Sequence, residues 1–332
     1  MSAIDADDLA LLAEGFEAAL RGHDAPGEAV AALHDLGWGE LLEAAPAPAI
    51  AATFRLLGST GSAASLIDDV ACWALGCEVD PGTAVVLPRP GSATPPARRD
   101  GDAIHVDGLA SSRLVEAGTV IVPVAPSGDE DDSAAGVVFV TLAEGAIGLI
   151  HGDAALDPTP SYRQVRATIS APSAAPIAAA GTWDTVVAAC RIALARELDG
   201  LARAMLELAR GHAMDREQFG RPVAMFQALR HKLAESFVQI EGAAAAADVW
   251  EPGADPLIAT LAKSLAGKAA RTTATHAQQV LAGIGFTTEH GFHRLLKRSM
   301  VVDQLFGSAS TLPAEIGRDL LARGHAPRLV EL

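Results

Sequence analysis

Residues 215–234 read DREQFGRPVAMFQALRHKLA and lie between two long amphipathic segments. Before them, apolar residues recur at helical spacing: Val187, Leu194, Leu198, Leu201, Met205 and Leu208. After the turn, a second apolar stripe follows the same period: Phe226, Leu229, Leu233, Phe237 and Ile240. Between the stripes, Phe219-Gly-Arg-Pro222 carries turn residues, and Pro222 suits the first turn of a new helix. The pattern predicts two adjacent antiparallel helices, the start of a helical bundle.

The rest of the C-terminal part is also predicted to be helical. Further helical patterns run over 256–281, 289–305 and 313–323. We therefore expect residues 173–332 to form a helical bundle domain of the four-helix type. The N-terminal residues 1–78 are also read as helical, with apolar runs over 9–20, 29–42 and 49–75 and Asp5 as a possible N-cap.

The residue pattern changes in residues 79–172, where short β-branched runs alternate with Pro, Gly and Asp. Strands are predicted over 84–87, 103–106, 119–122, 136–141 and 162–169, and loops over 89–101 and 127–133. The acidic run 129–132 is best explained as a solvated turn and not a metal site. The expected fold is mainly α with a small middle β domain, barrel-like or sandwich-like.

Charge and cysteine content exclude several classes of function. The chain of 332 residues carries a net charge of −16, which argues against nucleic acid as a partner. Its three cysteines are too few and too scattered for a disulfide framework or a zinc site, so we expect buried thiols and no metal. The N-terminus has no signal-peptide pattern and no window resembles a membrane span, so a cytoplasmic protein without membrane contact is expected.

Two segments of the bundle resemble the acyl-CoA dehydrogenase family. The stretch 215–234 is similar to that family's R-x-x-F-G-x-P turn followed by F-Q. About sixty residues later, 279–294 reads QVLAGIGFTTEHGFHR and is similar to its Q-x-x-G-G-x-G-F-T-x-E-H-x-x-H-R pattern, with Ala282 in place of the first paired Gly. The match is specific over 182–308 and vague over the first 170 residues. It implies the same order of a helical domain, a β domain and a helical bundle.

The resemblance implies FAD as cofactor, and the residue types fit this dinucleotide. Arg216 can pair with a pyrophosphate through its guanidinium fork, and Gly283 lets backbone approach a phosphate. Gln279 offers a donor and an acceptor to adenine or ribose. With Phe219, these residues would contact FAD bound mainly by a neighbouring subunit, and Ser308 would contribute from another loop. The alternative is that Phe219 and the glycines only form turns.

The family's reaction needs a carboxylate base, and neither usual position holds one. The resemblance places the base at Phe306 in most members, or at Cys190 in a smaller group. Phe306 accepts no proton, and a buried thiol such as Cys190 is usually inert. Glu197 lies two helical turns beyond Cys190 and is the weak remaining candidate, although a solvated acid is more common there. Glu289 and His290 are interpreted as helix-start residues capped by Thr287 or Thr288, and His293 as a packing residue.

The middle domain departs from the family as well. The stretch 86–92 keeps Pro90, Gly91 and Ser92 of the family's flavin-side loop but lacks its acid. The chain thus resembles the short, partly degenerate subunit of heteromeric bacterial acyl-CoA dehydrogenases, in which a homologous chain supplies the base within a heterotetramer. The implied function is introduction of a 2,3-double bond into an acyl-CoA thioester; the acyl group and the electron acceptor are left open. A homo-oligomer using Glu197 and a non-catalytic scaffold that binds acyl-CoA or a partner are the alternatives.

Overall fold

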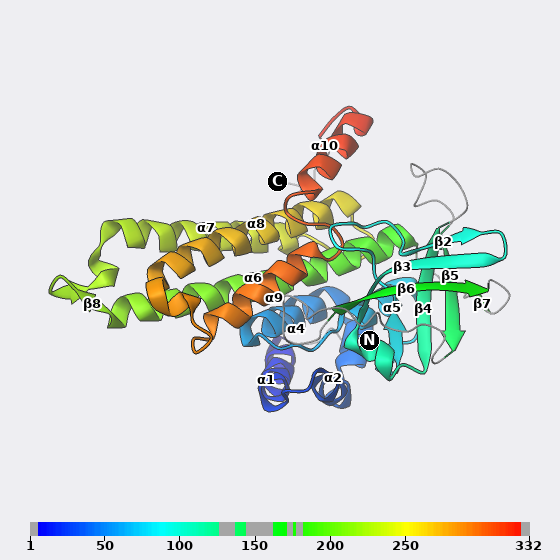
Figure 1. The fold of residues 1–332 in the computed structure, drawn as a ribbon, viewed down its shortest axis with the longest axis horizontal. Helices are drawn as coiled ribbons and strands as arrows, with labels where there is room; N and C mark the ends of the chain where they lie inside the picture. Colours follow the sequence, from blue (N-terminus) through cyan, green and yellow to red (C-terminus); the bar gives the residue numbers. More distant parts are fainter. Residues whose placement is uncertain (1–5, 126–136, 144–161, 171–174, 177–181, 327–332) are drawn as a thin grey trace.

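A computed structural model describes residues 6–125, 137–143, 162–170, 175–176 and 182–326 (Figure 1). The molecule is elongated, with a helical bundle at one end and a β-sheet at the other. The first helices pack beneath the junction of the two parts. The Asp5 cap, the acidic turn 129–132 and the predicted boundary at 172 lie outside the described residues. The predicted boundary at 78 falls between α5 and β1 and remains a proposal.

In the described part of the chain, five helices precede the sheet. They are α1 (Ala6–Gly22), α2 (Pro26–Asp35), α3 (Trp38–Ala44), α4 (Pro46–Thr60) and α5 (Ile67–Leu75). The run predicted over 29–42 is split in two, because Gly37 takes a left-handed φ of 91° that no helix continues. Gly61, at φ 64°, likewise ends α4 and divides the run predicted over 49–75. Local backbone geometry at these glycines therefore sets helix ends that the apolar periodicity did not predict.

The middle region forms one mixed sheet. Its strands are β1 (Thr83–Val85), β2 (Ala97–Asp100), β3 (Ala103–Ser111), β4 (Thr119–Ala125), β5 (Val138–Ala143), β6 (Tyr162–Ser170) and β7 (Ala175–Pro176). The order is β6-β3-β2-β4-β5-β7, with β1 parallel to β4. Because β6 and β7 stand at opposite ends and do not pair, the described strands close no barrel, and the barrel expectation is wrong. The loop predicted over 89–101 contains the strand β2. Its charged residues form no apolar pattern from which a strand could be predicted.

The bundle begins with α6 (Trp183–Asp215), a helix of 33 residues. A short hairpin of β8 (Glu217–Gln218) and β9 (Arg221–Pro222) leads through a 3-10 turn to α7 (Gln227–Asp248). It is followed by α8 (Pro256–Leu281), η4 (Ala282–Phe286), α9 (Phe292–Gln304) and α10 (Leu312–Arg323). The predicted helix 256–281 is confirmed, but Pro222 is extended in β9 and does not open a helix. Figure 1 shows α10 projecting away from the other four.

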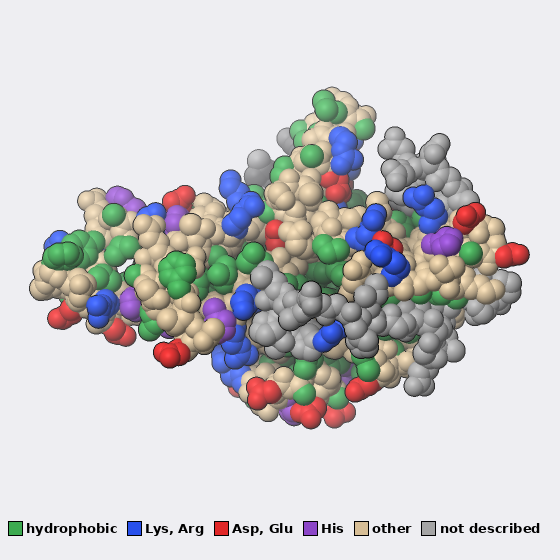
Figure 2. Space-filling view, in the orientation of Figure 1, with side chains coloured by type: hydrophobic (Ala, Val, Ile, Leu, Met, Phe, Trp, Pro, Cys, Tyr) green, Lys and Arg blue, Asp and Glu red, His purple; other side chains and the backbone are tan. Residues whose placement is uncertain are grey.

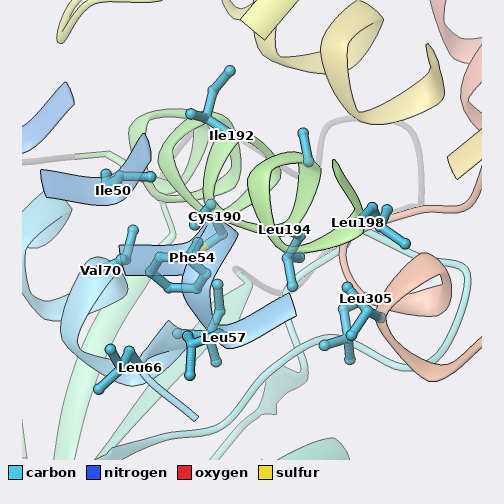
Figure 3. Close-up of a cluster of buried hydrophobic side chains, with 14 of the residues drawn as sticks. Ile50, Phe54, Leu57, Leu66, Val70, Cys190, Ile192, Leu194, Leu198 and Leu305 are labelled. Carbon is cyan, nitrogen blue, oxygen red and sulfur yellow. The ribbon is translucent and has the colours of Figure 1, made fainter. Parts of the chain in front are cut away.

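The core is centred on α6, which packs against α4, α5 and α8. Figure 3 shows side chains of these N-terminal helices gathered around Cys190 and Leu194. Two glycines let α4 and α6 cross closely, because a Cβ on Gly58 would lie 2.1 Å from Glu197 O and one on Gly200 would lie 2.1 Å from Arg55 O. The expectation of buried thiols holds for Cys72 and Cys190, while Cys77 is half-buried. No helix of the described part is long and apolar enough to span a bilayer.

Candidate functional site

The hairpin after α6 presents Arg216 and Phe219 to the surface. Arg216 caps α6 through its backbone N–H, which donates to His212 O at 2.9 Å, and its carbonyl accepts from Val223 N at 2.8 Å. The backbone is thus fixed while the side chain is exposed, and no carboxylate among the described residues pairs with its guanidinium. Phe219 has a φ of 55° and is 92% exposed. The hairpin therefore presents an exposed guanidinium and an exposed aromatic ring to the surface.

The turn after α8 is exposed in the same way. Gln279 and Gly283 both lie at the surface, and a Cβ added to Gly283 would meet nothing within 4 Å. Ala282 adopts φ 52° and ψ −133°, a region that glycine occupies and L side chains rarely do. The backbone thus keeps a glycine-type turn although its first residue is alanine. Alanine at position 282 therefore costs backbone strain, while the shape of the turn is retained.

Both turns lie at the same end of the bundle (Figure 1). A cavity of about 710 Å³ joins the end of α6 to the loop that follows the glycine turn; it is lined by residues that include His212, Asp215, His290 and Arg294. Burial lowers the pKa of His212, and the charges of His290 and Arg216 lower it further. The cavity thus places the end of α6 beside His290, in the segment that follows the glycine turn.

Ser308 lies at the opposite end of the bundle. Phe306, two residues before it, packs its ring against Trp183 at the start of α6, with centroids 6.1 Å apart. Arg216 follows the last residue of α6, and the 33 residues of this helix at about 1.5 Å each span about 50 Å. Ser308 is 1% exposed, and its Oγ lies 2.7 Å from Ser310 Oγ. The predicted cofactor residues thus fall into two groups that are separated by the length of α6.

The C-terminal part of the chain is similar to known proteins. Residues 184–323 match the family model described as acyl-CoA dehydrogenase, C-terminal domain. This segment therefore resembles the C-terminal domain of acyl-CoA dehydrogenases. Acyl-CoA dehydrogenase FadE34 of Mycobacterium tuberculosis is 38% identical over 123 residues, which cover 35% of this chain and 17% of the relative. Acyl-CoA dehydrogenase IpdE2 of the same organism is 37% identical over 129 residues, covering 39% of each. The matches thus span well under half of these relatives.

Solved structures show that the whole chain has the acyl-CoA dehydrogenase fold. The structure titled Tcur3481-Tcur3483 steroid ACAD G363A variant superposes with a TM-score of 0.73 at 22% identity, covering 96% of this chain and 98% of the other. The ChsE4-ChsE5 complex from Mycobacterium tuberculosis gives 0.72 at 18% identity, with 99% and 100% covered. A glutaryl-CoA dehydrogenase from Mycobacterium smegmatis in complex with FADH2 gives 0.72 at 19%, with 98% and 96% covered.

The base positions of the acyl-CoA dehydrogenase pattern are buried and unable to accept a proton. Phe306 is 1% exposed and held at φ 54°. Cys190 is fully buried, and burial raises the pKa of its thiol well above the usual range, with Asp68 and Cys72 adding to the effect. A thiol held neutral in an apolar core is a poor base.

Glu197 is an ion-pair residue in this fold and not a solvated acid. Glu197 is 1% exposed, and its Oε1 accepts a hydrogen bond from Arg298 Nε at 2.7 Å and forms an ion pair with Arg298 Nη2 at 2.7 Å. The Arg298 guanidinium also lies over the ring of Tyr162, 5.6 Å from its centroid. The expectation of a solvated side chain is wrong because the α4–α6 crossing and α9 cover this face. A carboxylate occupied by a buried cation is a structural element, not a free base.

The helix-start residues take different roles from those expected. α9 begins at Phe292, so Thr287 and Thr288 do not cap it. Instead Thr287 Oγ1 donates to Ile284 O at 2.9 Å, and the backbone N–H of Phe292 donates to His290 Nδ1 at 3.2 Å. His293 donates from Nδ1 to His290 O at 2.8 Å, a structural contact. The imidazole of His290 therefore accepts a backbone N–H at the start of α9, which is the role expected of a threonine cap.

A second cavity, missed in the sequence, lies beside the Phe306 loop. It measures about 740 Å³ and is lined by residues of 91–94, the first turns of α6 and α8, and α10. Gly91 N donates to Gln304 O at 2.7 Å, which ties the Pro90-Gly91-Ser92 loop to the end of α9. Arg191 at its wall donates to both oxygens of Glu315, at 2.7 and 2.8 Å, and to Phe306 O at 3.0 Å.

Two charged residues within apolar helical stretches were the features of the sequence that could have pointed to this cavity. Arg191 interrupts an apolar run of α6, and Lys263 interrupts the Ala-rich α8. A charged residue on a buried helix face needs a partner, so each position marks a tertiary contact before its partner is known. Periodicity cannot supply the partner, because Glu315 lies 124 residues from Arg191.

Proposed function

We propose that this chain is a subunit of an FAD-dependent acyl-CoA dehydrogenase that introduces a 2,3-double bond into a CoA thioester. In this assignment it contributes cofactor and oligomer contacts, and a homologous chain contributes the catalytic base. The observation that carries the proposal is the separation of Arg216 from Ser308 by the length of α6. One dinucleotide cannot reach both ends of a helix of about 50 Å. If both groups contact FAD, they contact it in different sites, and each site is completed by a second chain.

The exposed residues of the hairpin end fit FAD. The Arg216 fork suits a pyrophosphate, and the open space above Gly283 admits a close phosphate or ribose. Phe219 would be buried by the cofactor or by the partner chain, which removes the cost of an aromatic ring in water. Bound FAD supplies the hydride acceptor of the reaction. This chain's residues bind and orient the pyrophosphate and adenosine half of the cofactor.

Exposed hydrophobic side chains support a subunit contact at the same end. Met214, Phe219, Met225, Ile284 and Phe286 are between 43% and 92% exposed. Figure 2 shows hydrophobic side chains at this tip of the bundle among scattered charges. A group of this kind is typical of an interface. A partner that covers it would complete the flavin site and bury the ring of Phe219 in one step.

The missing base argues for an unlike partner. Removal of the α-proton requires a carboxylate with a suitable pKa, and Phe306, Cys190 and Glu197 cannot provide one. A second copy of this chain would bring the same three residues. Two of the similar solved structures are named for pairs of proteins, ChsE4-ChsE5 and Tcur3481-Tcur3483. A heteromer with a homologous chain that bears the acid is therefore proposed, a heterotetramer by resemblance.

The cavity of about 740 Å³ is the proposed place for part of the acyl-CoA substrate. Arg318 lies at its wall, is exposed and has no ion-pair partner among the described residues. CoA carries phosphates that such a cation can bind. The Phe306 ring fills the position of the base nearby, so the cavity is suited to binding and not to proton removal.

Flavin content tests the proposal. Purified alone, the chain is expected to hold far less than one FAD per chain by flavin absorbance. Co-expressed with a homologous chain that carries the missing Glu, it should join a yellow complex that oxidises an acyl-CoA. Stoichiometric FAD and full dehydrogenase activity in the chain alone would instead establish a homo-oligomer with a base elsewhere.

A non-catalytic scaffold is the second candidate. It is favoured by the apolar packing of Phe306 and by the pairing of Glu197, which leave no proton acceptor at the expected positions. In that case neither preparation binds flavin, while the chain still binds acyl-CoA or a partner protein.

A further inference from the structure

Lys263 is fully buried beneath the loop that follows α9. Its side chain is 0% exposed, which is rare for lysine. The ammonium donates to Asp303 O at 2.9 Å and to Gly307 O at 3.3 Å, and lies 4.0 Å from Asp303 Oδ1. One side chain from α8 therefore holds both ends of the segment 303–307.

This segment needs to be held, because its backbone is strained. Phe306 has a φ of 54° and Gly307 a φ of 95°, and a left-handed conformation is unfavourable for a phenylalanine. Asp303 Oδ1 accepts from Ala309 N at 3.0 Å and closes the loop from within. Gly267, one turn after Lys263, leaves room for this carboxylate, since a Cβ there would lie 2.2 Å from Asp303 Oδ1.

The charged groups around Lys263 come from three helices. Asp303 of α9 faces it directly, while Arg191 and Glu197 of α6 lie farther away. Glu315 of α10 reaches the region through its pair with Arg191. Burial lowers the pKa of Lys263 to about 8, against the attraction of Asp303, with Arg191 lowering it further and Glu197 raising it.

We propose that Lys263 is a positioning residue whose buried ammonium fixes the backbone of the 303–308 loop. The loop carries Ser308, so the clamp would also set the presentation of this residue to the cofactor; that part rests on the proposed function. The physical reason is that a charged donor makes hydrogen bonds roughly twice as strong as a neutral one. A side chain without a donor at this position would leave both buried carbonyl oxygens without their hydrogen bonds.

Hydrogen exchange of the full chain tests the clamp without flavin. Protection of the peptide covering 303–312 is measured at about pH 7, corrected for the intrinsic rate, in wild type and in Lys263→Met. This peptide should be about tenfold less protected in the variant than in wild type. Arg196→Met is the matched control, because it removes a buried cation that pairs with Asp248 and does not touch the loop.

Lys263→Gln keeps a hydrogen-bond donor and is the milder second variant, so its loop should be better protected than that of Lys263→Met. Wild-type protection of the 303–312 peptide in both variants, or an equal loss in Arg196→Met, would overturn the clamp. In the co-expressed complex, Lys263→Met should release FAD more readily than Arg196→Met does. Equal release would overturn the link to the cofactor, and absence of flavin from every preparation would overturn the proposed function but leave the clamp standing.

Discussion

The ring of Phe306 packs against the ring of Trp183, with centroids 6.1 Å apart and planes inclined by 35°. The contact joins the loop after α9 to the first residue of α6, across 123 residues of sequence. The contact puts an apolar ring at the position where the resemblance implies a carboxylate. The side chain at this position therefore has a packing role in the fold.

Phe306→Ala should destabilise the chain by about 3–5 kcal/mol, because it deletes a fully buried ring and leaves a cavity. Phe237→Ala is the control, since Phe237 is 51% exposed and its removal should change the free energy of unfolding by about 0.5 kcal/mol or less. Urea unfolding followed by circular dichroism measures both. Similar losses for the two variants would contradict the burial described here.

Glu197→Gln should cost about 3–5 kcal/mol of stability, because it leaves the Arg298 guanidinium without its buried carboxylate. The double variant Glu197→Met, Arg298→Met should recover most of that loss, since no unpaired charge then remains buried. A double-mutant cycle on the free energy of unfolding measures the coupling. If the complex keeps its turnover in the double variant, Glu197 is structural; loss of turnover with full stability would show a catalytic role.

Gly200→Ala should destabilise by about 3 kcal/mol or more, because the new Cβ meets the Arg55 carbonyl where α4 crosses α6. Gly211→Ala, on the same helix, has nothing within 4 Å of the new Cβ and should stabilise by about 0.5–1 kcal/mol through helix propensity. Thermal unfolding of the two variants gives opposite shifts. Shifts of the same sign would show that the close crossing is absent.

Asp68→Asn should stabilise the chain at neutral pH more than at acid pH. Burial raises the pKa of Asp68 above its unfolded value, against the opposing charge of Arg113. Below the unfolded pKa of about 3.9 the carboxyl is neutral in both states and costs nothing. As pH rises, the unfolded state releases the proton first and wild type loses stability, which the amide avoids. The melting-temperature difference between variant and wild type should grow from about pH 3 to about pH 7; a constant difference would contradict this.

Arg216→Ala should weaken FAD retention of the co-expressed complex about tenfold or more, because a charge-assisted contact to the pyrophosphate is lost. Arg210→Ala is the matched control, as Arg210 is exposed on the same helix and pairs only with Glu207 among the described residues. Flavin released during gel filtration reports the difference. Equal retention in both variants would remove Arg216 from the cofactor site.

Much of the bundle could be predicted because the residue patterns that specify its helices and turns involve positions close together in the sequence. A helix was predicted from about Pro256 to Leu281, and the structure has it over these residues, since Pro256 and the apolar stripe mark its course. The divisions at Gly37 and Gly61 were missed, because apolar periodicity continues through a residue whose backbone turns left-handed. β2 was missed because its charged residues, Arg98 and Arg99, face outward and offer no apolar run.

The sequence by itself determined the helical period, the two turns and the residues that link them to one family, because each depends on side chains a few positions apart. Only the tertiary structure decided that Glu197 is paired with Arg298, that Lys263 holds the loop after α9, and that Ser308 lies about 50 Å along α6 from Arg216. These relationships join residues about 40 to 100 positions apart in sequence. Such pairs form because a buried charge must find a partner in the folded chain, and local sequence cannot specify which one.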